Sequence, residues 1–180
     1  MDTPIKVSYR WSADEVLLLT RLHMRYSAQG RKLTSSFRSG GILFLFIGVL
    51  LLCGAALTHQ KLRALVFGLG LVLLGLAILV GMPRLLQKSV LKSYAKGPDK
   101  DLVIAYELSE EGISSKTDVA SSNFLWRTFQ RVLRTDDGFL LYRTDTQVQW
   151  LPTHSFQVPA DADRFADLAK SKVTDYEDKR

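Results

Sequence analysis

The side chains that most often carry catalysis are scattered along this 180-residue chain. No Ser-His-Asp order, metal-ligand spacing or glycine-rich phosphate loop connects the acids and bases of the C-terminal half, which include Glu107, Asp136, Asp137 and His154. The two aspartates precede Gly138, a sequence typical of a hairpin turn. The single cysteine, Cys53, excludes an internal disulfide and a cysteine-built zinc site. We therefore expect no enzyme, and no catalytic residue, cofactor or metal site.

Arginines form the more promising cluster. Residues 98–180 hold 11 basic and 15 acidic residues, and within this acidic region four arginines lie close in sequence, namely Arg127, Arg131, Arg134 and Arg143. They are a candidate binding patch for an anionic group, with an ordinary solvated face as the alternative. The neighbouring Trp126 lies in an alternating segment and is expected to be a core residue.

Two apolar runs dominate the rest of the chain. Residues 39–60 and 64–83 contain no charged side chain. Each run supplies roughly 19–20 helical residues, or about 28–30 Å, which matches the hydrocarbon core of a bilayer. Only Lys61, Leu62 and Arg63 separate them. The pattern predicts a transmembrane helical hairpin. The alternatives are two buried core helices and a cleaved signal peptide, for which the first run begins too late.

Basic residues flank the hairpin on both sides. Ten lie close to its outer ends, and they are Arg21, Arg25, Arg31, Lys32, Arg38, Arg84, Lys88, Lys92, Lys96 and Lys100. The loop has only Lys61 and Arg63. The positive-inside rule therefore predicts a multi-pass protein with both termini in the cytoplasm. Attraction to anionic membrane lipids fits this charge, whereas nucleic acid is not expected as a partner because the C-terminal half is acidic.

Small residues recur along both apolar runs. One face of the first run carries Gly41, Gly48 and Ala55, and one face of the second carries Ala64, Gly68 and Gly75. Such faces allow close approach of membrane helices. A roughly opposite face of the second run carries Gly70, Ala77 and Gly81. This is a candidate helix-docking face for a second copy or a partner helix, with the general glycine enrichment of membrane helices as the alternative.

The segments next to the hairpin are predicted to be a strand and basic helices. Residues 5–9 alternate like a strand, and Ser12 with Glu15 form a capping box for a helix over residues 13–28 that stops at Gly30. This helix is expected to pack on the soluble domain or to lie on lipid headgroups. Pro83 marks a kink or helix end. Residues 84–97 then read as a basic juxtamembrane helix.

Beyond residue 98 the period changes to two. Strands are expected over 101–108, 113–118, 121–126, 129–135, 139–143 and 148–151, followed by a helix over 159–173 and a flexible tail over 175–180. The expected class is an α+β membrane protein, with the hairpin inserted into a mostly antiparallel β domain that forms a bent sheet or small barrel. The domains are 1–38, 39–83, 84–97, 98–174 and 175–180, and the strand at residues 5–9 is expected to join the later sheet.

These features resemble the YcxB-like family of small bacterial membrane proteins. The resemblance rests on Y-x-L-S-x-x-G-I, a tryptophan-containing strand, D-G-F-x-L-Y and L-P-x-x-x-F, which here comprise Tyr106, Leu108, Ser109, Gly112, Ile113, Trp126, Phe129, Val132, Asp137, Gly138, Phe139, Leu141, Tyr142, Leu151, Pro152 and Phe156. It implies a cytoplasmic domain similar to pleckstrin-homology folds, an inner-membrane location and no particular reaction. The chain departs from the pattern at His154, where the family resemblance implies a basic residue.

The function expected from the sequence is therefore a non-enzymatic interaction module anchored in the inner membrane. Its cytoplasmic domain would bind a protein or lipid partner. The alternative is an accessory or immunity-type subunit whose hairpin docks on a larger membrane protein. Membrane lipids are expected partners, together with a protein partner or a homo-oligomer formed through the second apolar helix.

Overall fold

The computed structural model describes residues 3–57 and 61–180. Its contacts divide the chain into two units. The first, which we call the β unit, combines Met1–His23 with Tyr94–Arg180. The second, the helical unit, is Met24–Ser93. The protein is thus α+β, with two long apolar helices in an insertion between the first and second strands.

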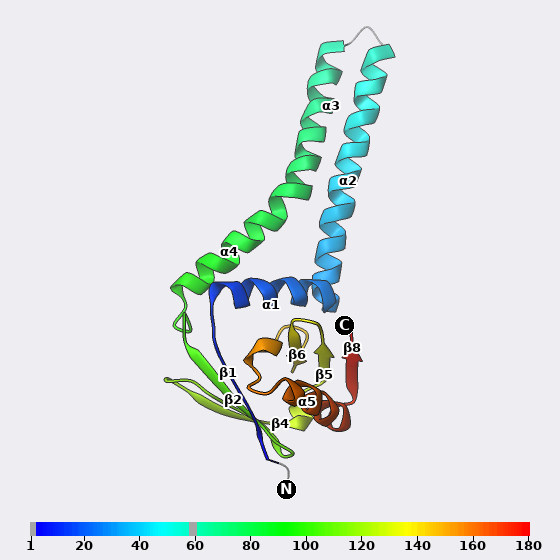
Figure 1. Cartoon of the computed structure of the whole chain (residues 1–180). Coiled ribbons are helices and arrows are strands. Elements are labelled where there is room, and N and C mark those ends of the chain that lie inside the picture. Colours follow the sequence, from blue (N-terminus) through cyan, green and yellow to red (C-terminus); the bar gives the residue numbers. More distant parts are fainter. Residues whose placement is uncertain (1–2, 58–60) are drawn as a thin grey trace. The chain divides into compact units, whose positions relative to one another are not determined.

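The first sheet of the β unit contains four antiparallel strands in the order β1-β2-β3-β4 (Figure 1). They are β1 (Ile5–Arg10), β2 (Val103–Leu108), β3 (Gly112–Lys116) and β4 (Ser121–Leu125). The register of β1 on β2 runs from Ile5↔Leu108 to Arg10↔Val103. This pairing confirms that the N-terminal strand joins the sheet formed after residue 101, because its alternating apolar residues face the same core.

The second sheet has the order β7-β6-β5-β8. It contains β5 (Arg131–Arg134), β6 (Gly138–Tyr142), β7 (Val148–Pro152) and β8 (Asp175–Asp178). β5, β6 and β7 pair antiparallel, whereas β8 pairs parallel with β5. We expected a flexible tail after residue 174, but β8 is a strand. The strands expected to form a bent sheet or small barrel lie in two sheets. The sheets are connected by an isolated bridge between Val7 and Phe156 and by a 2.7 Å hydrogen bond from the Tyr9 hydroxyl to the Trp150 carbonyl.

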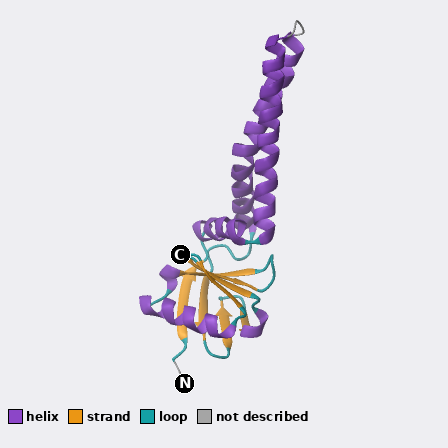
Figure 2. Ribbon diagram, turned by 90° about the vertical axis from the view of Figure 1, so that its right-hand side faces the viewer, coloured by secondary structure: helices purple, strands orange, loops and turns teal. Residues whose placement is uncertain are grey.

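Every residue of β6 is buried, so both faces of the second sheet are covered. Helix α5 (Pro159–Lys172) covers one face of the sheet (Figure 2). It packs there through Phe165, whose ring lies 4.9 Å from that of Phe139 in an edge-on arrangement. Trp126 and Phe156 also pack on Phe165. Trp126 is 5% exposed and donates its indole N–H to the Ser109 carbonyl at 2.8 Å. Its expected place in the core is confirmed.

Helix α1 (Ala13–Tyr26) covers the other face through its residues up to His23. The Glu15 carboxylate accepts a hydrogen bond from the Trp150 indole N–H on β7, and the His23 ring stacks on Tyr142 of β6 at 5.8 Å. This helix was expected either to pack on the domain or to lie on lipid headgroups. The part of α1 in the β unit packs on the domain. The capping box forms in part, since Ser12 Oγ accepts from the Glu15 amide at 3.3 Å while the Glu15 carboxylate binds Trp150 instead.

Hydrogen bonds join the residues that follow β1 to the residues that precede β2. The Trp11 amide donates to the Leu102 carbonyl at 2.8 Å, and the Tyr94 hydroxyl donates to the Trp11 carbonyl at 2.8 Å. Asp101 adopts a positive φ of 60°, with its amide donating to the Trp11 carbonyl at 3.2 Å. The 92 residues between Arg10 and Val103 thus leave and re-enter the sheet at neighbouring strands.

The helical unit consists mainly of α2 (Ala28–Leu57) and α3 (Lys61–Leu76), which run side by side (Figure 1). A π-helical turn, η1 (Ala77–Gly81), continues α3 into α4 (Met82–Lys96). Two stretches are apolar and long enough to cross a membrane, namely Ala28–Ala55 in α2 and Leu62–Lys96, the continuous helix formed by α3, η1 and α4. A Cβ on Gly48 would meet the Gly68 carbonyl oxygen at 2.8 Å, and one on Gly75 would meet that of Gly41 at 2.8 Å. The first small-residue faces thus form the hairpin contact, as expected.

Two helix boundaries differ from the sequence prediction. Gly30 does not stop a helix but lies in the first turn of α2, where Ser27 Oγ accepts a hydrogen bond from its amide at 2.9 Å. Lys61, Leu62 and Arg63 begin α3 instead of forming a loop, and residues 58–60, counted with the first apolar run, lie outside the described residues. Of the kink or helix end expected at Pro83, the helix end does not occur, because Pro83 lies within α4. The π-helical turn just before Pro83 adjusts the hydrogen-bond ladder where proline lacks an N–H.

Candidate binding site at the edge of β5

The predicted arginine patch is built mainly on β5, a short R-V-L-R strand. Its two central residues, Val132 and Leu133, are fully buried. Its two terminal arginines remain partly exposed, with 21% and 11% of the side chains of Arg131 and Arg134 accessible. Burial of the apolar pair anchors the strand, so that the two guanidinium groups are held at its ends.

Both of these arginines meet carboxylates of the same chain. Arg131 lies 2.5 Å from Glu177 and 3.6 Å from Asp175, both on β8. Arg134 lies 2.5 Å from Asp163 on α5. Two of these acids have a lowered pKa: the Arg134 hydrogen bond lowers the pKa of Asp163, and a Lys179 hydrogen bond first and Arg131 second lower the pKa of Glu177. The β5 part of the patch therefore already recognises acidic side chains.

The other two arginines are placed differently. Arg143 follows β6 and lies over the Phe124 ring at 4.7 Å, a cation–π arrangement. Arg127 is exposed in the short 3₁₀ helix η2 (Trp126–Thr128). The structure thus brings two of the four arginines into one set of ion pairs with β8 and α5, and gives the remaining two separate environments. Sequence reasoning found the arginines but missed their acidic partners, which lie on β8 for Arg131 and on α5 for Arg134.

The candidate helix-docking face lies in the helical unit. A Cβ on Gly70 or Gly81 would have no atom within 4 Å, and Ala77 is exposed. This face is therefore not used by the hairpin contact. Unlike the β5 edge, it presents no polar group that would select a ligand.

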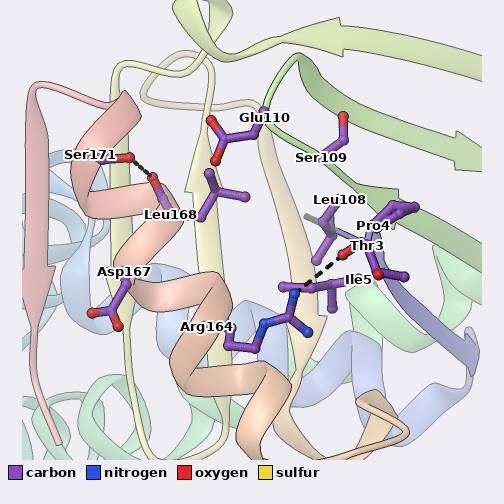
Figure 3. A pocket seen from close by; sticks show the side chains of 10 residues that line it. All are labelled: Thr3, Pro4, Ile5, Leu108, Ser109, Glu110, Arg164, Asp167, Leu168 and Ser171. Atoms are coloured by element: carbon purple, nitrogen blue, oxygen red, sulfur yellow. Dashed lines mark hydrogen bonds between the residues drawn. The ribbon is translucent and has the colours of Figure 1, made fainter. Parts of the chain in front are cut away.

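A cavity of about 350 Å³ lies between the start of β1, the end of β2 and α5 (Figure 3). Ile5 and Leu108 form its apolar wall, and Arg164 crosses it to donate to the Thr3 carbonyl at 3.3 Å. Its two serine hydroxyls donate to backbone carbonyls, that of Ser109 to Gly112 and that of Ser171 to Leu168. The described lining contains no histidine or cysteine that could activate a nucleophile.

The comparisons with known proteins bear on the same part of the chain. Residues 108–169 match the family model described as YcxB-like protein. This segment is YcxB-like. The resemblance expected from the sequence motifs is thereby confirmed over these residues. No curated protein and no solved structure matches the chain.

The YcxB-like segment runs from the end of β2 to α5. It contains the aromatic cluster of Trp126, Phe139, Phe156 and Phe165, and it also contains β5 with both of its arginines. β8 and the two apolar helices lie outside the matched residues. The match therefore covers the strand that carries the candidate site but not the acidic strand that occupies its edge.

Proposed function

We propose that this protein is a non-enzymatic interaction module anchored in the bacterial inner membrane. In this proposal α2 and the continuous helix of α3 and η1 cross the bilayer, and both termini lie in the cytoplasm. The β unit is a PH-like domain held at the membrane to bind a protein or lipid partner. The observation that carries the proposal is the pairing of β1 with β2 across an insertion that contains two span-length apolar helices.

The antiparallel pairing of β1 with β2 supports an even number of crossings. Because the two strands are adjacent, the insertion must begin and end on the same side of any membrane that it crosses. The outward side chains of α2 suit contact with lipid, since Ile42, Phe46 and Leu50 are 55–62% exposed. Water would make such a surface costly, whereas hydrocarbon solvates it.

Charge supports the cytoplasmic placement and a lipid contact. In α4, Lys88, Lys92 and Lys96 recur every four residues and are exposed. This spacing places them on one side of the helix. Each exposed basic residue near an anionic leaflet contributes about 1 kcal/mol of attraction. Membrane lipids are therefore proposed partners of α4.

The strand order supports a PH-like fold for the β unit. Strands β1–β4 form one antiparallel sheet and β5–β7 form three antiparallel strands of the other, after which α5 packs on the aromatic cluster. This succession of seven strands and a helix is what the resemblance to pleckstrin-homology folds implies. Such domains bind partners through strand edges and loops rather than through a catalytic centre.

The second candidate function is an accessory or immunity-type subunit whose hairpin docks on a larger membrane protein. It is favoured by the open space beside Gly70 and Gly81, which the hairpin contact leaves unused. A second copy of the chain would also fit this face, giving a homo-oligomer.

Site-specific photo-crosslinking in intact cells tests the two candidates together. A photoreactive residue at Arg127 or Arg143 probes the β unit, and one at Gly70 probes the helix face. The interaction-module proposal predicts protein adducts from the β-unit positions. Protein adducts from Gly70 alone would favour the accessory-subunit proposal. Absence of protein adducts from every position would contradict protein binding by either route.

A further inference from the structure

The edge of β5 is occupied by the end of its own chain. β8 follows α5 and runs parallel to β5, with the register Arg131↔Asp175, Val132↔Tyr176, Leu133↔Glu177 and Arg134↔Asp178. The Lys179 amide extends the pairing by donating to the Arg134 carbonyl at 2.9 Å. A segment that is chemically unlike the rest of the sheet therefore supplies the last strand.

The two strands match in charge as well as in backbone pairing. β5 reads R-V-L-R and β8 reads D-Y-E-D, so each arginine of β5 stands in register with an aspartate. Arg131 contacts two acids of β8, Asp175 and Glu177, which lie two residues apart and therefore on the same face of the strand. This is the recognition pattern of a strand edge, in which main-chain hydrogen bonds hold the segment and alternate side chains select it.

β8 is held with little apolar burial. Asp175 and Asp178 are exposed, and Tyr176 and Glu177 are only half-buried. By contrast, the β5 residues that β8 faces in the middle of the register, Val132 and Leu133, are fully buried. The strand is therefore attached through backbone hydrogen bonds and partly exposed ion pairs, the contacts typical of a segment that opens locally without unfolding its domain.

We propose that the β5 edge is a docking site for an acidic extended segment of a protein partner, and that β8 occupies this site as an exchangeable intramolecular ligand. The partner segment carries acidic residues at alternate positions that meet Arg131, and it pairs parallel with β5. β8 keeps the edge covered until the partner replaces it. The inference rests on the proposed function, since it names the partner class of the interaction module.

Peptide binding to the purified full-length protein and to a variant ending at Thr174 tests the proposal. The probe is a fluorescent peptide of residues 174–180, and the matched control peptide carries asparagine or glutamine in place of the three acids of β8. We expect the truncated variant to bind the acidic peptide about tenfold more tightly than the neutral one. The full-length protein is expected to bind the acidic peptide about tenfold more weakly than the variant, because β8 competes from the same chain.

A charge exchange separates recognition from loss of folding. In the truncated protein, Arg131→Glu should weaken binding of the acidic peptide and should favour a peptide with lysine at the two positions equivalent to Asp175 and Glu177. Equal binding of acidic and neutral peptides, or unchanged binding after Arg131→Glu, would overturn the proposal. So would equal binding of the acidic peptide by the full-length and truncated proteins.

Hydrogen exchange of the intact chain provides a test that needs no truncation. The amides of β8 should exchange at least about tenfold faster than those of β6, because an exchangeable strand opens without global unfolding. Equally slow exchange of the two strands would overturn the proposal. Neither measurement depends on a membrane, so a failure here is distinguishable from a failure of the proposed membrane anchoring.

Discussion

The indole N–H of Trp150 donates to the carboxylate of Glu15 at 2.5 Å, although 135 residues separate them. This hydrogen bond connects the first helix of the β unit to β7, a strand that the chain forms only after the entire insertion. His154 also lies 3.4 Å from the same carboxylate. The sheet that carries the candidate binding edge, whose strands all follow the apolar hairpin in sequence, is therefore packed against a helix that precedes the hairpin.

Substitution of Glu15 tests how strongly this contact stabilises the β unit. Glu15→Ala leaves the indole N–H of Trp150 without its acceptor in a position that is 1% exposed. We expect a loss of about 1–3 kcal/mol in the free energy of unfolding, measured by tryptophan fluorescence in detergent. Glu15→Gln retains an acceptor oxygen and should lose less. Equal stability of Glu15→Ala and wild type would show that the contact is not structural.

The hairpin contact can be tested with two glycines of similar sequence context. A Cβ at Gly48 would meet the Gly68 carbonyl oxygen at 2.8 Å, whereas one at Gly70 would meet nothing within 4 Å. Gly48→Ala should therefore destabilise the hairpin by about 1–3 kcal/mol through overpacking, with Gly70→Ala as the matched control. Denaturant titration of the helical circular dichroism signal in detergent measures both. A greater loss at Gly70 than at Gly48 would contradict the described helix pairing.

Alkaline pH should unfold the β unit through its buried tyrosines. Burial raises the pKa of Tyr106 and of Tyr142 from 10.0 to about 12, an effect that Arg131 partly opposes at Tyr142. Since the folded-state pKa is the higher one, the stabilisation is complete below pH 10.0 and is lost as the pH rises toward 12. Tyrosinate absorbance and tryptophan fluorescence, recorded together, should change in this window. Full tyrosine ionisation near pH 10 with an intact tryptophan signal would contradict their burial.

The ion pairs of β8 should govern how readily that strand opens. Arg131→Met removes the contacts to Asp175 and Glu177 while keeping an apolar side chain. Hydrogen exchange of β8 should accelerate up to about fivefold, the effect expected from about 1 kcal/mol for partly exposed pairs. Arg127→Met, in the exposed η2 helix, is the control and should leave β8 unchanged. The same acceleration in both variants would show that the ion pairs of Arg131 do not control the opening of β8.

Local patterns in the sequence predicted much of the β unit. Sequence patterns located β1–β7 to within a few residues, and the alternation is clearest in β1, where every second residue is buried. Apolar alternation could not predict β8, because D-Y-E-D has no apolar period. Its ion-pair partner Arg131 lies on β5, which is adjacent in the sheet but distant in sequence. The Glu15 carboxylate is a similar case: the local pattern predicted a capping role that the carboxylate does not adopt, and its hydrogen bond to Trp150 was not predictable.

Gly30 shows how one residue can carry two opposite signals. Glycine after a helical run usually marks a helix end, and we expected a stop there. Instead, a Cβ at this position would meet the Met24 backbone at 2.5 Å, and Ser27 Oγ caps the Gly30 amide. The glycine is required by close approach at the start of α2. A serine three residues before it is the signal that identifies the new helix.

Thiol labelling of intact cells measures the central claim directly, namely that α2 and α3 cross the membrane and hold the β unit in the cytoplasm. In a Cys53→Ala background, one variant carries Arg63→Cys near the start of α3 and another carries Ser171→Cys on α5, both at exposed positions. A membrane-impermeant maleimide should label Arg63→Cys in intact cells and Ser171→Cys only after permeabilisation. Labelling of Ser171→Cys in intact cells, or protection of both positions until the membrane is opened, would contradict the account.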